Sequence, residues 1–306
     1  FKTGTQIGEG DICLIHNLAL TELEEDAYLF RLSQFKDELI SVIESETFGI
    51  RPASRKNEVL RFLEAEPLHD IAISRKSVTW GVTVPWDKSH TVYVWIDALL
   101  NYLSATDPEG PEFSGGQRPT FPPATQFIGK DILRFHAVIW PALLLAAKKP
   151  LPGDLGVLGF YTVEGQKMSK TLGNVVTPQD LVSRYGVDAA RYLLLAIMPF
   201  GADADISWER FDTLYASDLA NNLGNLISRV QAMIIQYNHG SVPNAPLDNI
   251  NLDLLIKAQF GAVIPALQDH LNRLNRYIDQ EKPWELAKNT SDRQKLNTVL
   301  ATLAEN

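Results

Sequence analysis

The sequence is poor in cysteine and has no long apolar run. Cys13 is the only cysteine in 306 residues, so the chain forms no internal disulfide, and we expect a cytoplasmic location. The longest uncharged apolar stretch, IWPALLLAA at 139–147, is too short to span a bilayer, so we expect no membrane partner. The formal net charge of −9 excludes a chain that is basic overall, but it allows local basic stretches that bind nucleotides or nucleic acid.

Two stretches change from a strand-like to a helix-like pattern. TVYVWIDALLNYLSA (91–105) begins with β-branched and aromatic residues and continues as a helix, and the stretch 125–147 does the same around Gly129. Such repeated units predict a parallel sheet flanked by helices, in an α/β fold. Ligands of these sheets bind at the carboxyl ends of the strands. At that edge we place Trp95, Asp97, Lys130 and Asp131.

Helical patterns occupy one early stretch and the last third of the chain. Residues 24–44 carry apolar side chains at helical spacing, at Tyr28, Leu29, Leu32, Phe35, Leu39 and Val42, and we expect a helix or helix pair there. Thr177, Pro178 and Asp180 have the pattern of a helix start. Apolar stripes then predict a bundle of helices over 178–198, 207–237, 251–281 and 291–303.

The stretch GQKMSKTLGN (165–174) places two lysines, Lys167 and Lys170, between Gly165 and Gly173. Lysine is a mobile point charge suited to phosphate, and the glycines let a segment close over a ligand. Such a loop fits phosphoryl or nucleotidyl transfer, in which negative charge builds up in the transition state. Two lysines at this spacing are, on their own, more often a solvated surface turn. The neighbouring blocks therefore decide between the two readings.

KMSKT followed by LGN resembles the second signature loop of the class I aminoacyl-tRNA synthetases, whose usual form is KMSKS. Thr171 keeps the hydroxyl of the final serine. Other blocks resemble the methionyl branch of that family in the same order: SRKNEVLRFL (54–63), HDIAISR (69–75), YVWIDALLNYLSA (93–105), IGKDILRFHAVIWPALL (128–144), DLANNLGNLISR (218–229) and EKPWELAK (281–288). The resemblance covers nearly the whole chain.

This resemblance implies the second half of a class I Rossmann-type parallel sheet, followed by an all-α anticodon-binding bundle. Residues 1–92 would belong to an inserted connective domain of the zinc-knuckle type with its linker, and 93–155 to the second half of the catalytic domain. Residues 156–206 would form the domain of the KMSKS loop, which contacts the tRNA stem. The range 207–306 would be the bundle, left incomplete.

The activity implied by the resemblance is ATP-dependent activation of methionine to methionyl-adenylate, followed by transfer to tRNA(Met), with Mg²⁺. It implies catalytic roles for Lys167 and Lys170. It implies ATP binding by Lys130, Asp131, Lys167, Met168, Ser169 and Lys170. From the residues alone, Asp131 is equally a helix N-terminal acid that complements the macrodipole.

Large side chains gather in the two strand-to-helix blocks, and His136 and Trp140 are four apart on one helix face. Aromatic edges make favourable contacts with a thioether, so an aromatic cage suits methionine. Without the family, core packing is the favoured interpretation of these aromatics. The resemblance implies methionine contacts for Trp95, Ala98, Tyr102, Ile132, His136 and Trp140. Leu99 stands where some members have proline, which implies a differently shaped wall.

In the helical region, Asn225 and Arg229 are four apart and share a face, while Trp284 offers a stacking plane. Unpaired bases are recognised by stacking and hydrogen bonds of this kind. In a bundle, such residues more often bridge helices or pack in the core. The resemblance implies that all three read the anticodon. Two positions depart from the family: Ala216 replaces its usual Asn, and Leu158 its usual His.

Cys13 and His16 have the C-x-x-H spacing of half a zinc knuckle. A buried structural cysteine is the commoner case. The resemblance implies the second ligand pair of the zinc-binding inserted domain that some family members carry, with Zn²⁺ in the complete protein. No second C-x-x-C is present, so these residues cannot complete a four-coordinate site.

None of the six histidines begins an H-x-G-H pattern, the form of the first class I signature. The chain also opens on Phe1 without a leader, so we expect a partial enzyme, inactive alone, whose N-terminal half is supplied in cis or in trans. Two alternatives stay open. One is a non-catalytic tRNA-binding or assembly module derived from a synthetase. The other is a nucleotidyl transferase with a small acceptor, against which Asn225, Arg229 and Trp284 argue.

Overall fold

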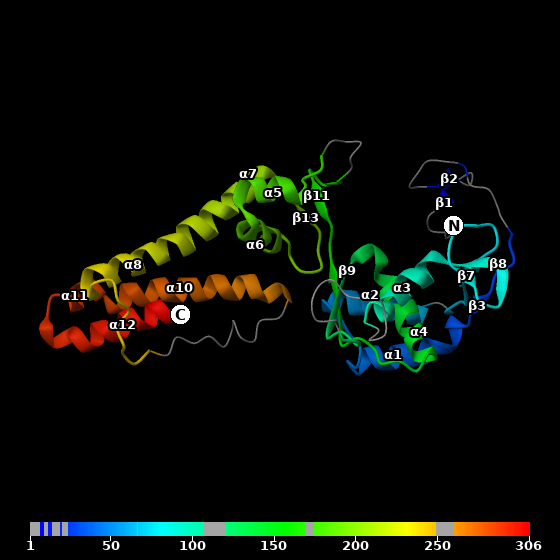
Figure 1. The fold of residues 1–306 in the computed structure, drawn as a ribbon, viewed down its shortest axis with the longest axis horizontal. Coiled ribbons are helices and arrows are strands. Elements are labelled where there is room, and N and C mark those ends of the chain that lie inside the picture. Colours follow the sequence, from blue (N-terminus) through cyan, green and yellow to red (C-terminus); the bar gives the residue numbers. More distant parts are fainter. Residues whose placement is uncertain are drawn as a thin grey trace. The chain divides into compact units, whose positions relative to one another are not determined.

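The structure is a computed structural model. It describes residues 7–8, 12–13, 19, 24–65, 67–106, 120–168, 174–248 and 260–306 (Figure 1). The chain forms two compact units. Unit 1 comprises Phe1–Ile50, Lys56–Gln126 and Arg134–Leu155, and unit 2 comprises Arg51–Arg55, Phe127–Leu133 and Gly156–Asn306. Each unit is described separately below.

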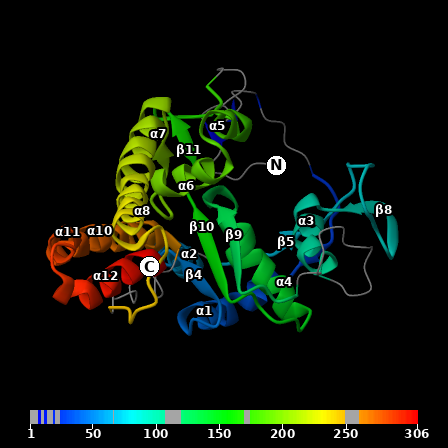
Figure 2. The same ribbon diagram turned by 60° about the vertical axis from the view of Figure 1, so that its left-hand side comes forward.

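A three-stranded sheet with the order β4-β10-β9 gives the chain its α/β class. Its strands are β4 (Gly49–Arg51), β9 (Thr125–Gly129) and β10 (Asp154–Leu158), which lie side by side in Figure 2. Helix α4 (Trp140–Ala146) connects β9 to β10, and parallel strands need such a crossover. The predicted strand around Phe127 and the parallel sheet are therefore confirmed.

The other predicted strand-to-helix unit was only partly right. Strand β8 (Asp87–Val92) ends before the expected point, and α3 (Val94–Ser104) already contains Trp95 and Asp97. Moreover, β8 pairs antiparallel with both β6 (Ser74–Arg75) and β7 (Thr83–Val84). Trp95 and Asp97 therefore do not lie at the end of a parallel strand. The β-branched run continues into the helix because Ile96 and Leu99, three apart, are buried on one face.

The helix predicted over 24–44 begins later than expected. Residues 29–30 form strand β3 (Leu29–Phe30), which pairs with β5 (Ile71–Ala72). A 3₁₀ turn, η2 (Leu32–Phe35), leads into α1 (Lys36–Glu44). Leu29 fits the helical spacing but is 61% exposed, so this part of the periodicity was coincidental. Only Leu32 and Leu39 of the six predicted positions are buried.

Unit 1 also contains most of α2 (Ala53–Ala65) and the part of the helical stretch after β9 that begins at Arg134. That stretch begins as the 3₁₀ turn η3 (Lys130–Ile132), which belongs to unit 2, and continues as the π-helix η4 (Phe135–Ile139) before α4. A core cluster of Leu99, Trp140 and Leu144 packs α3 against α4. The short strands β1 (Ile7–Gly8) and β2 (Ile12–Cys13) form an antiparallel pair.

Unit 2 begins with a small sheet of order β12-β11-β13. Strands β11 (Tyr161–Val163) and β12 (Gln166–Lys167) form a hairpin, and β13 (Ala204–Asp205) runs parallel to β11. Helices α5 (Pro178–Tyr185) and α6 (Val187–Ile197) follow the hairpin. The expected helix start is confirmed, because Thr177 and Asp180 form a capping box. The single helix predicted over 178–198 is broken at Gly186, whose φ is 80°.

The helical bundle was predicted correctly in outline. Helix α7 (Trp208–Leu214), the π-helix η5 (Tyr215–Gly224) and α8 (Asn225–Asn238) follow one another without a break. They are followed by η6 (Phe260–Ala262), α10 (Val263–Glu281), α11 (Pro283–Leu286), η7 (Thr290–Asp292) and α12 (Arg293–Glu305). The start of the helix predicted from 251 lies outside the described residues. Among the helices that are described, none has the length and apolar character needed to cross a membrane.

Candidate functional site

Three of the predicted pocket residues meet in unit 1. The phenol oxygen of Tyr102, on α3, lies 2.9 Å from Nε2 of His136. The ring centroids of Tyr102 and Trp140 are 5.7 Å apart, and those of Tyr102 and His136 are 5.8 Å apart in an edge-to-face arrangement. The expected convergence of these aromatic side chains is therefore present.

Burial controls the chemistry of this aromatic cluster, which we define as Tyr102, His136 and Trp140. Burial raises the pKa of Tyr102, so its hydroxyl stays protonated and shares a hydrogen bond with Nε2 of His136. Trp140 is 0% exposed, and Leu99 packs in the same core. The indole N–H of Trp140 has no acceptor among the described residues. The cluster thus combines an apolar wall with one donor that has no acceptor in the described part of the chain.

Trp95 lies in the same block but has a different partner. Its ring stacks on Phe135 with centroids 3.9 Å apart and an interplanar angle of 19°. Phe135 was missed by the sequence reasoning, although it directly precedes His136 in an aromatic-rich block. Ala98 is half-buried on α3. Ile132 belongs to unit 2, so its role beside the cluster stays a prediction.

Lys130 and Asp131 follow β9 directly, at the carboxyl end of a parallel strand, as predicted. The Nζ of Lys130 lies 2.6 Å from Oδ2 of Asp203 and 4.8 Å from the ring centroid of Phe160. The backbone N–H of Phe160 also donates to Asp203, and these two donors lower the pKa of the Asp203 carboxyl. The charge of Lys130 is therefore held by a carboxylate that sequence reasoning did not find.

Asp131 is exposed beside the tight start of η3. A Cβ added to Gly129 would lie 2.8 Å from Oδ1 of Asp131, which is closer than real Cβ contacts allow. A side chain at Gly129 would therefore displace the carboxylate. Gly129 thus leaves room for the Asp131 carboxylate in its present position.

The hairpin β11–β12 leads into the predicted lysine loop. Lys167 is the last residue of β12 and pairs with Thr162 across the hairpin. Met168 is half-buried and packs against a core that includes Leu181, Leu193 and Phe211. Ser169 and Lys170 lie outside the described residues, as does the side chain of Lys167. Their catalytic and ATP-binding roles stay predictions.

Known proteins match this chain in sequence and in structure. A family model described as "tRNA synthetases class I (M)" matches residues 7–231. A methionine–tRNA ligase of Streptomyces coelicolor is 41% identical over 97% of this chain and 59% of its own length. One of Caldanaerobacter subterraneus subsp. tengcongensis is 41% identical over 100% of this chain and 50% of its own length. The chain belongs to the methionyl-tRNA synthetase family.

The fold supports the same conclusion. A solved structure of Mycobacterium tuberculosis methionyl-tRNA synthetase in complex with methionyl-adenylate superposes on the whole of this chain with a TM-score of 0.83 at 35% identity. The match covers 64% of that chain. This chain thus spans between half and two thirds of the length of these relatives.

In a methionyl-tRNA synthetase the anticodon residues are expected on the bundle. Arg229, on the exposed surface of α8, donates to Oδ1 of Asn275 at 3.2 Å and to Oδ1 of Asp279 at 3.1 Å, both on α10. Asn225 is exposed one helical turn earlier, and Trp284 on α11 is 40% exposed. All three are thus accessible at least in part, but Arg229 also bridges two helices, as the alternative interpretation expected.

The zinc prediction for this synthetase falls largely on residues that the structure does not describe. His16 and the side chain of Cys13 lie outside the described residues. Within the described part, no group of three or more His, Cys, Asp or Glu side chains is arranged to hold a metal ion. Zinc binding at Cys13 and His16 therefore stays a prediction.

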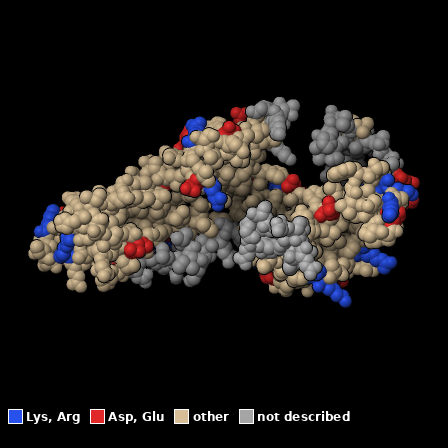
Figure 3. Space-filling view, in the orientation of Figure 1, with Lys and Arg blue, Asp and Glu red and all other residues tan. Residues whose placement is uncertain are grey.

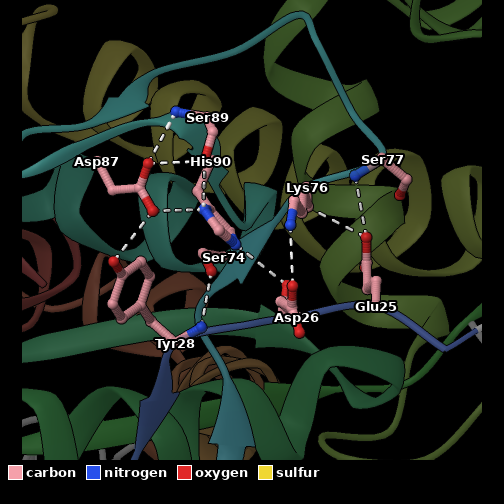
Figure 4. Close-up of polar contacts among 9 residues, drawn as sticks. All are labelled: Glu25, Asp26, Tyr28, Ser74, Lys76, Ser77, Asp87, Ser89 and His90. Atoms are coloured by element: carbon pink, nitrogen blue, oxygen red, sulfur yellow. Dashed lines mark hydrogen bonds and ion pairs between the residues drawn. The ribbon is translucent and has the colours of Figure 1, made fainter.

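A polar network joins β8 to the segment before β3 (Figure 4). The carboxylate of Asp87, on β8, accepts hydrogen bonds from Ser89, from the hydroxyl of Tyr28 at 3.1 Å and from Nδ1 of His90 at 2.8 Å. These donors, led by Ser89, hold the pKa of Asp87 well below its usual value. Nε2 of His90 lies 3.2 Å from the carbonyl oxygen of Asp26. The network ties β8 to the segment before β3, and α3 begins two residues after β8 ends.

Proposed function

We propose that this chain carries the methionine pocket and the tRNA-binding bundle of a methionine–tRNA ligase. The enzyme would activate methionine with ATP to methionyl-adenylate and transfer methionine to tRNA(Met). The observation that carries the proposal is the contact of Tyr102 with His136 and Trp140, within a chain that superposes on a relative holding methionyl-adenylate. A cluster of aromatic rings suits a thioether, which gains from contact with aromatic edges.

In the first step, a carboxylate oxygen of methionine attacks the α-phosphate of ATP, and pyrophosphate leaves. Lys167 and Lys170 would stabilise the negative charge that develops on the departing phosphates, together with Mg²⁺. No protein nucleophile is needed. Magnesium is usually held by substrate phosphates and one or two carboxylates, so it requires no cage of protein ligands. We assign ATP binding to Lys130, Asp131, Met168 and Ser169 as well.

Selectivity for methionine would come from the aromatic cluster with Trp95, Ala98 and Ile132. Apolar contacts discriminate between similar side chains by only about 1 to 3 kcal/mol. The hydrogen bond between Tyr102 and His136 supports this role, because it fixes the two rings relative to each other.

In the second step, tRNA(Met) would be recognised through the bundle by Asn225, Arg229 and Trp284. On the face drawn in Figure 3, the Lys and Arg of the described residues form small groups beside Asp and Glu rather than one broad basic area. Such a surface is better suited to recognising unpaired bases by stacking and hydrogen bonds than to binding the phosphates by charge attraction alone.

We propose that the isolated chain is inactive, because it contains no HIGH-type signature to hold ATP. The second half of the site would be supplied in cis or in trans, Zn²⁺ would be bound only in the complete protein, and the protein would work in the cytoplasm. One alternative has an observation of its own: the bundle has its own buried core, so a non-catalytic tRNA-binding module could keep this part alone.

Methionine-dependent exchange of pyrophosphate into ATP tests the proposal. The full-length protein should catalyse this exchange with methionine, and not with leucine at equal concentration. The 306-residue chain alone should show none while still binding tRNA(Met). A full-length protein that binds tRNA(Met) but lacks any methionine-dependent exchange would instead establish the non-catalytic module.

A further inference from the structure

The carboxylate of Asp205 contacts both parts of the hairpin that ends at Lys167. Its Oδ1 accepts hydrogen bonds from the hydroxyl of Thr162 at 2.9 Å and from the backbone N–H of Gly165 at 2.8 Å. Thr162 lies in β11 and pairs directly with Lys167 of β12. One carboxylate oxygen therefore links the turn of the hairpin to the residue opposite Lys167.

The turn of this hairpin has an unusual backbone. Glu164 and Gly165 have positive φ angles of 54° and 70°, the sign that a type I′ two-residue turn requires at both central positions. Glu164 is not glycine, so its left-handed conformation costs energy and must be offset by local contacts. The hydrogen bond from the N–H of Gly165 to Asp205 is such a contact, and it comes from outside the hairpin.

Asp205 is itself held firmly on β13. The strand pairs with β11 in parallel register, Thr162 opposite Asp205, and the N–H of Ile206 donates to the carbonyl oxygen of Thr162 at 2.8 Å. The side chain of Arg210 donates to the carbonyl oxygen of Asp205. The hairpin thus meets a fixed acceptor rather than a mobile side chain.

The acceptor is also charged. The N–H of Gly165, followed by the hydroxyl of Thr162, lowers the pKa of the Asp205 carboxyl below its usual value. Asp205 is therefore ionised at neutral pH, and hydrogen bonds to an ionised acceptor are roughly twice as strong as neutral ones. The nearby carboxylate of Asp203 likewise accepts one side-chain and one backbone hydrogen bond, from Lys130 and from the N–H of Phe160.

We propose that Asp205 is a positioning residue for Lys167, resting on the nucleotide-binding role proposed above for that lysine. By fixing Thr162 and the Glu164–Gly165 turn, Asp205 sets where β12 ends and where Lys167 leaves the sheet. A displacement of about 1 Å in a group that must meet developing charge costs as much as 100-fold in rate. Asp205 would therefore act on the rate of adenylate formation without touching any substrate.

The test compares Asp205→Ala and Asp205→Asn in the full-length protein. Alanine removes the acceptor, whereas asparagine keeps an oxygen in the same place and removes only the charge. Asp212→Ala is the matched control: Asp212 is also an exposed carboxylate of unit 2, with hydrogen bonds from Tyr185 at 2.7 Å and Arg184 at 2.5 Å, but it does not contact the hairpin. Hydrogen exchange at the Gly165 amide and methionine-dependent pyrophosphate exchange are measured for each variant.

In the Asp205→Ala variant, the Gly165 amide should exchange its hydrogen about tenfold faster than in the wild type. The variant's kcat should be about 10- to 100-fold lower, with KM for methionine unchanged. Asp205→Asn should retain most of the wild-type amide protection and kcat. Asp212→Ala should change neither the amide exchange rate nor kcat. Faster amide exchange with an unchanged kcat would overturn the positioning role, as would unchanged amide exchange. If the wild-type protein lacks methionine-dependent exchange, the proposed function fails and Lys167 loses its role. The amide exchange then still decides whether Asp205 anchors the hairpin.

Discussion

The hydroxyl of Tyr102 on α3 and Nε2 of His136 on the π-helix η4 share a hydrogen bond of 2.9 Å. The bond joins the two helical segments that hold the proposed methionine pocket. Its strength should therefore be visible in the affinity for methionine.

Tyr102→Phe removes this hydrogen bond and keeps the ring that packs on Trp140. A typical intramolecular hydrogen bond contributes about 1 kcal/mol, so we expect KM for methionine to rise about fivefold with little change in KM for ATP. Pyrophosphate exchange by the full-length protein, with each substrate varied in turn, measures both. Tyr93→Phe serves as the control, because it keeps the ring over which Arg75 lies at 4.2 Å. Equal increases in the two KM values would contradict a role of Tyr102 in the methionine pocket.

The contacts of the aromatic cluster could be predicted only in part from the sequence. The spacing of His136 and Trp140 and the family resemblance brought Tyr102, His136 and Trp140 together correctly. The stacking of Trp95 on Phe135 was missed, because the π-helix at 135–139 rotates side chains away from the positions of a regular α-helix. A single sequence carries no clear sign of a π-helix.

The features predicted best were those that depend on residues close together in the sequence. The capping box at Thr177 and the bundle helices depend on short-range patterns, and both are present. The helix expected from residue 24 failed because β3 pairs with β5, which lies about forty residues away, and long-range pairing overrides local periodicity. The ion pair between Lys130 and Asp203 could not be predicted either, because the two residues are 73 positions apart in the sequence.

The capping box also makes a prediction about pH. Thr177→Ala removes the cap of α5 and should destabilise the full-length protein by about 1 kcal/mol at neutral pH. The hydroxyl and N–H of Thr177 lower the pKa of Asp180 from its ordinary value of 3.8. Ionised Asp180 therefore stabilises the folded state above that value, and the contribution is lost as the pH falls through the lowered pKa. Thermal unfolding of Asp180→Asn and wild type should differ at neutral pH and converge in acid. A constant difference down to acidic pH would contradict the capping role of the carboxylate.

Variants of Arg229 and its partner Asp279 distinguish a stabilising role of Arg229 from a role in binding tRNA. Its ion pair with Asp279 joins side chains that are 42% and 66% exposed, and exposed pairs contribute at most about 1 kcal/mol. Asp279→Asn should therefore change the unfolding temperature little and leave Arg229 in place to bind RNA. Arg229→Ala should weaken binding of tRNA(Met) by about tenfold or more, since it removes a base contact worth about 1 to 3 kcal/mol. Titration of labelled tRNA(Met) measures both variants. If both weakened binding equally, Arg229 would act by joining α8 to α10 rather than by touching RNA.

Trp284 gives the sharpest test of the anticodon assignment. Its ring is 40% exposed at the start of the short helix α11, so part of its surface is available for a base to stack on. Stacking on an aromatic side chain contributes about 1 to 3 kcal/mol per base, and Trp284→Ala should weaken binding of tRNA(Met) by roughly 5- to 150-fold. Trp284→Phe keeps a smaller stacking plane and should lose less. Trp86, which is 69% exposed in unit 1, offers a matched control, since Trp86→Ala removes the same side chain away from the bundle. Unchanged binding by Trp284→Ala would remove Trp284 from the anticodon site and leave it as a packing residue of α11.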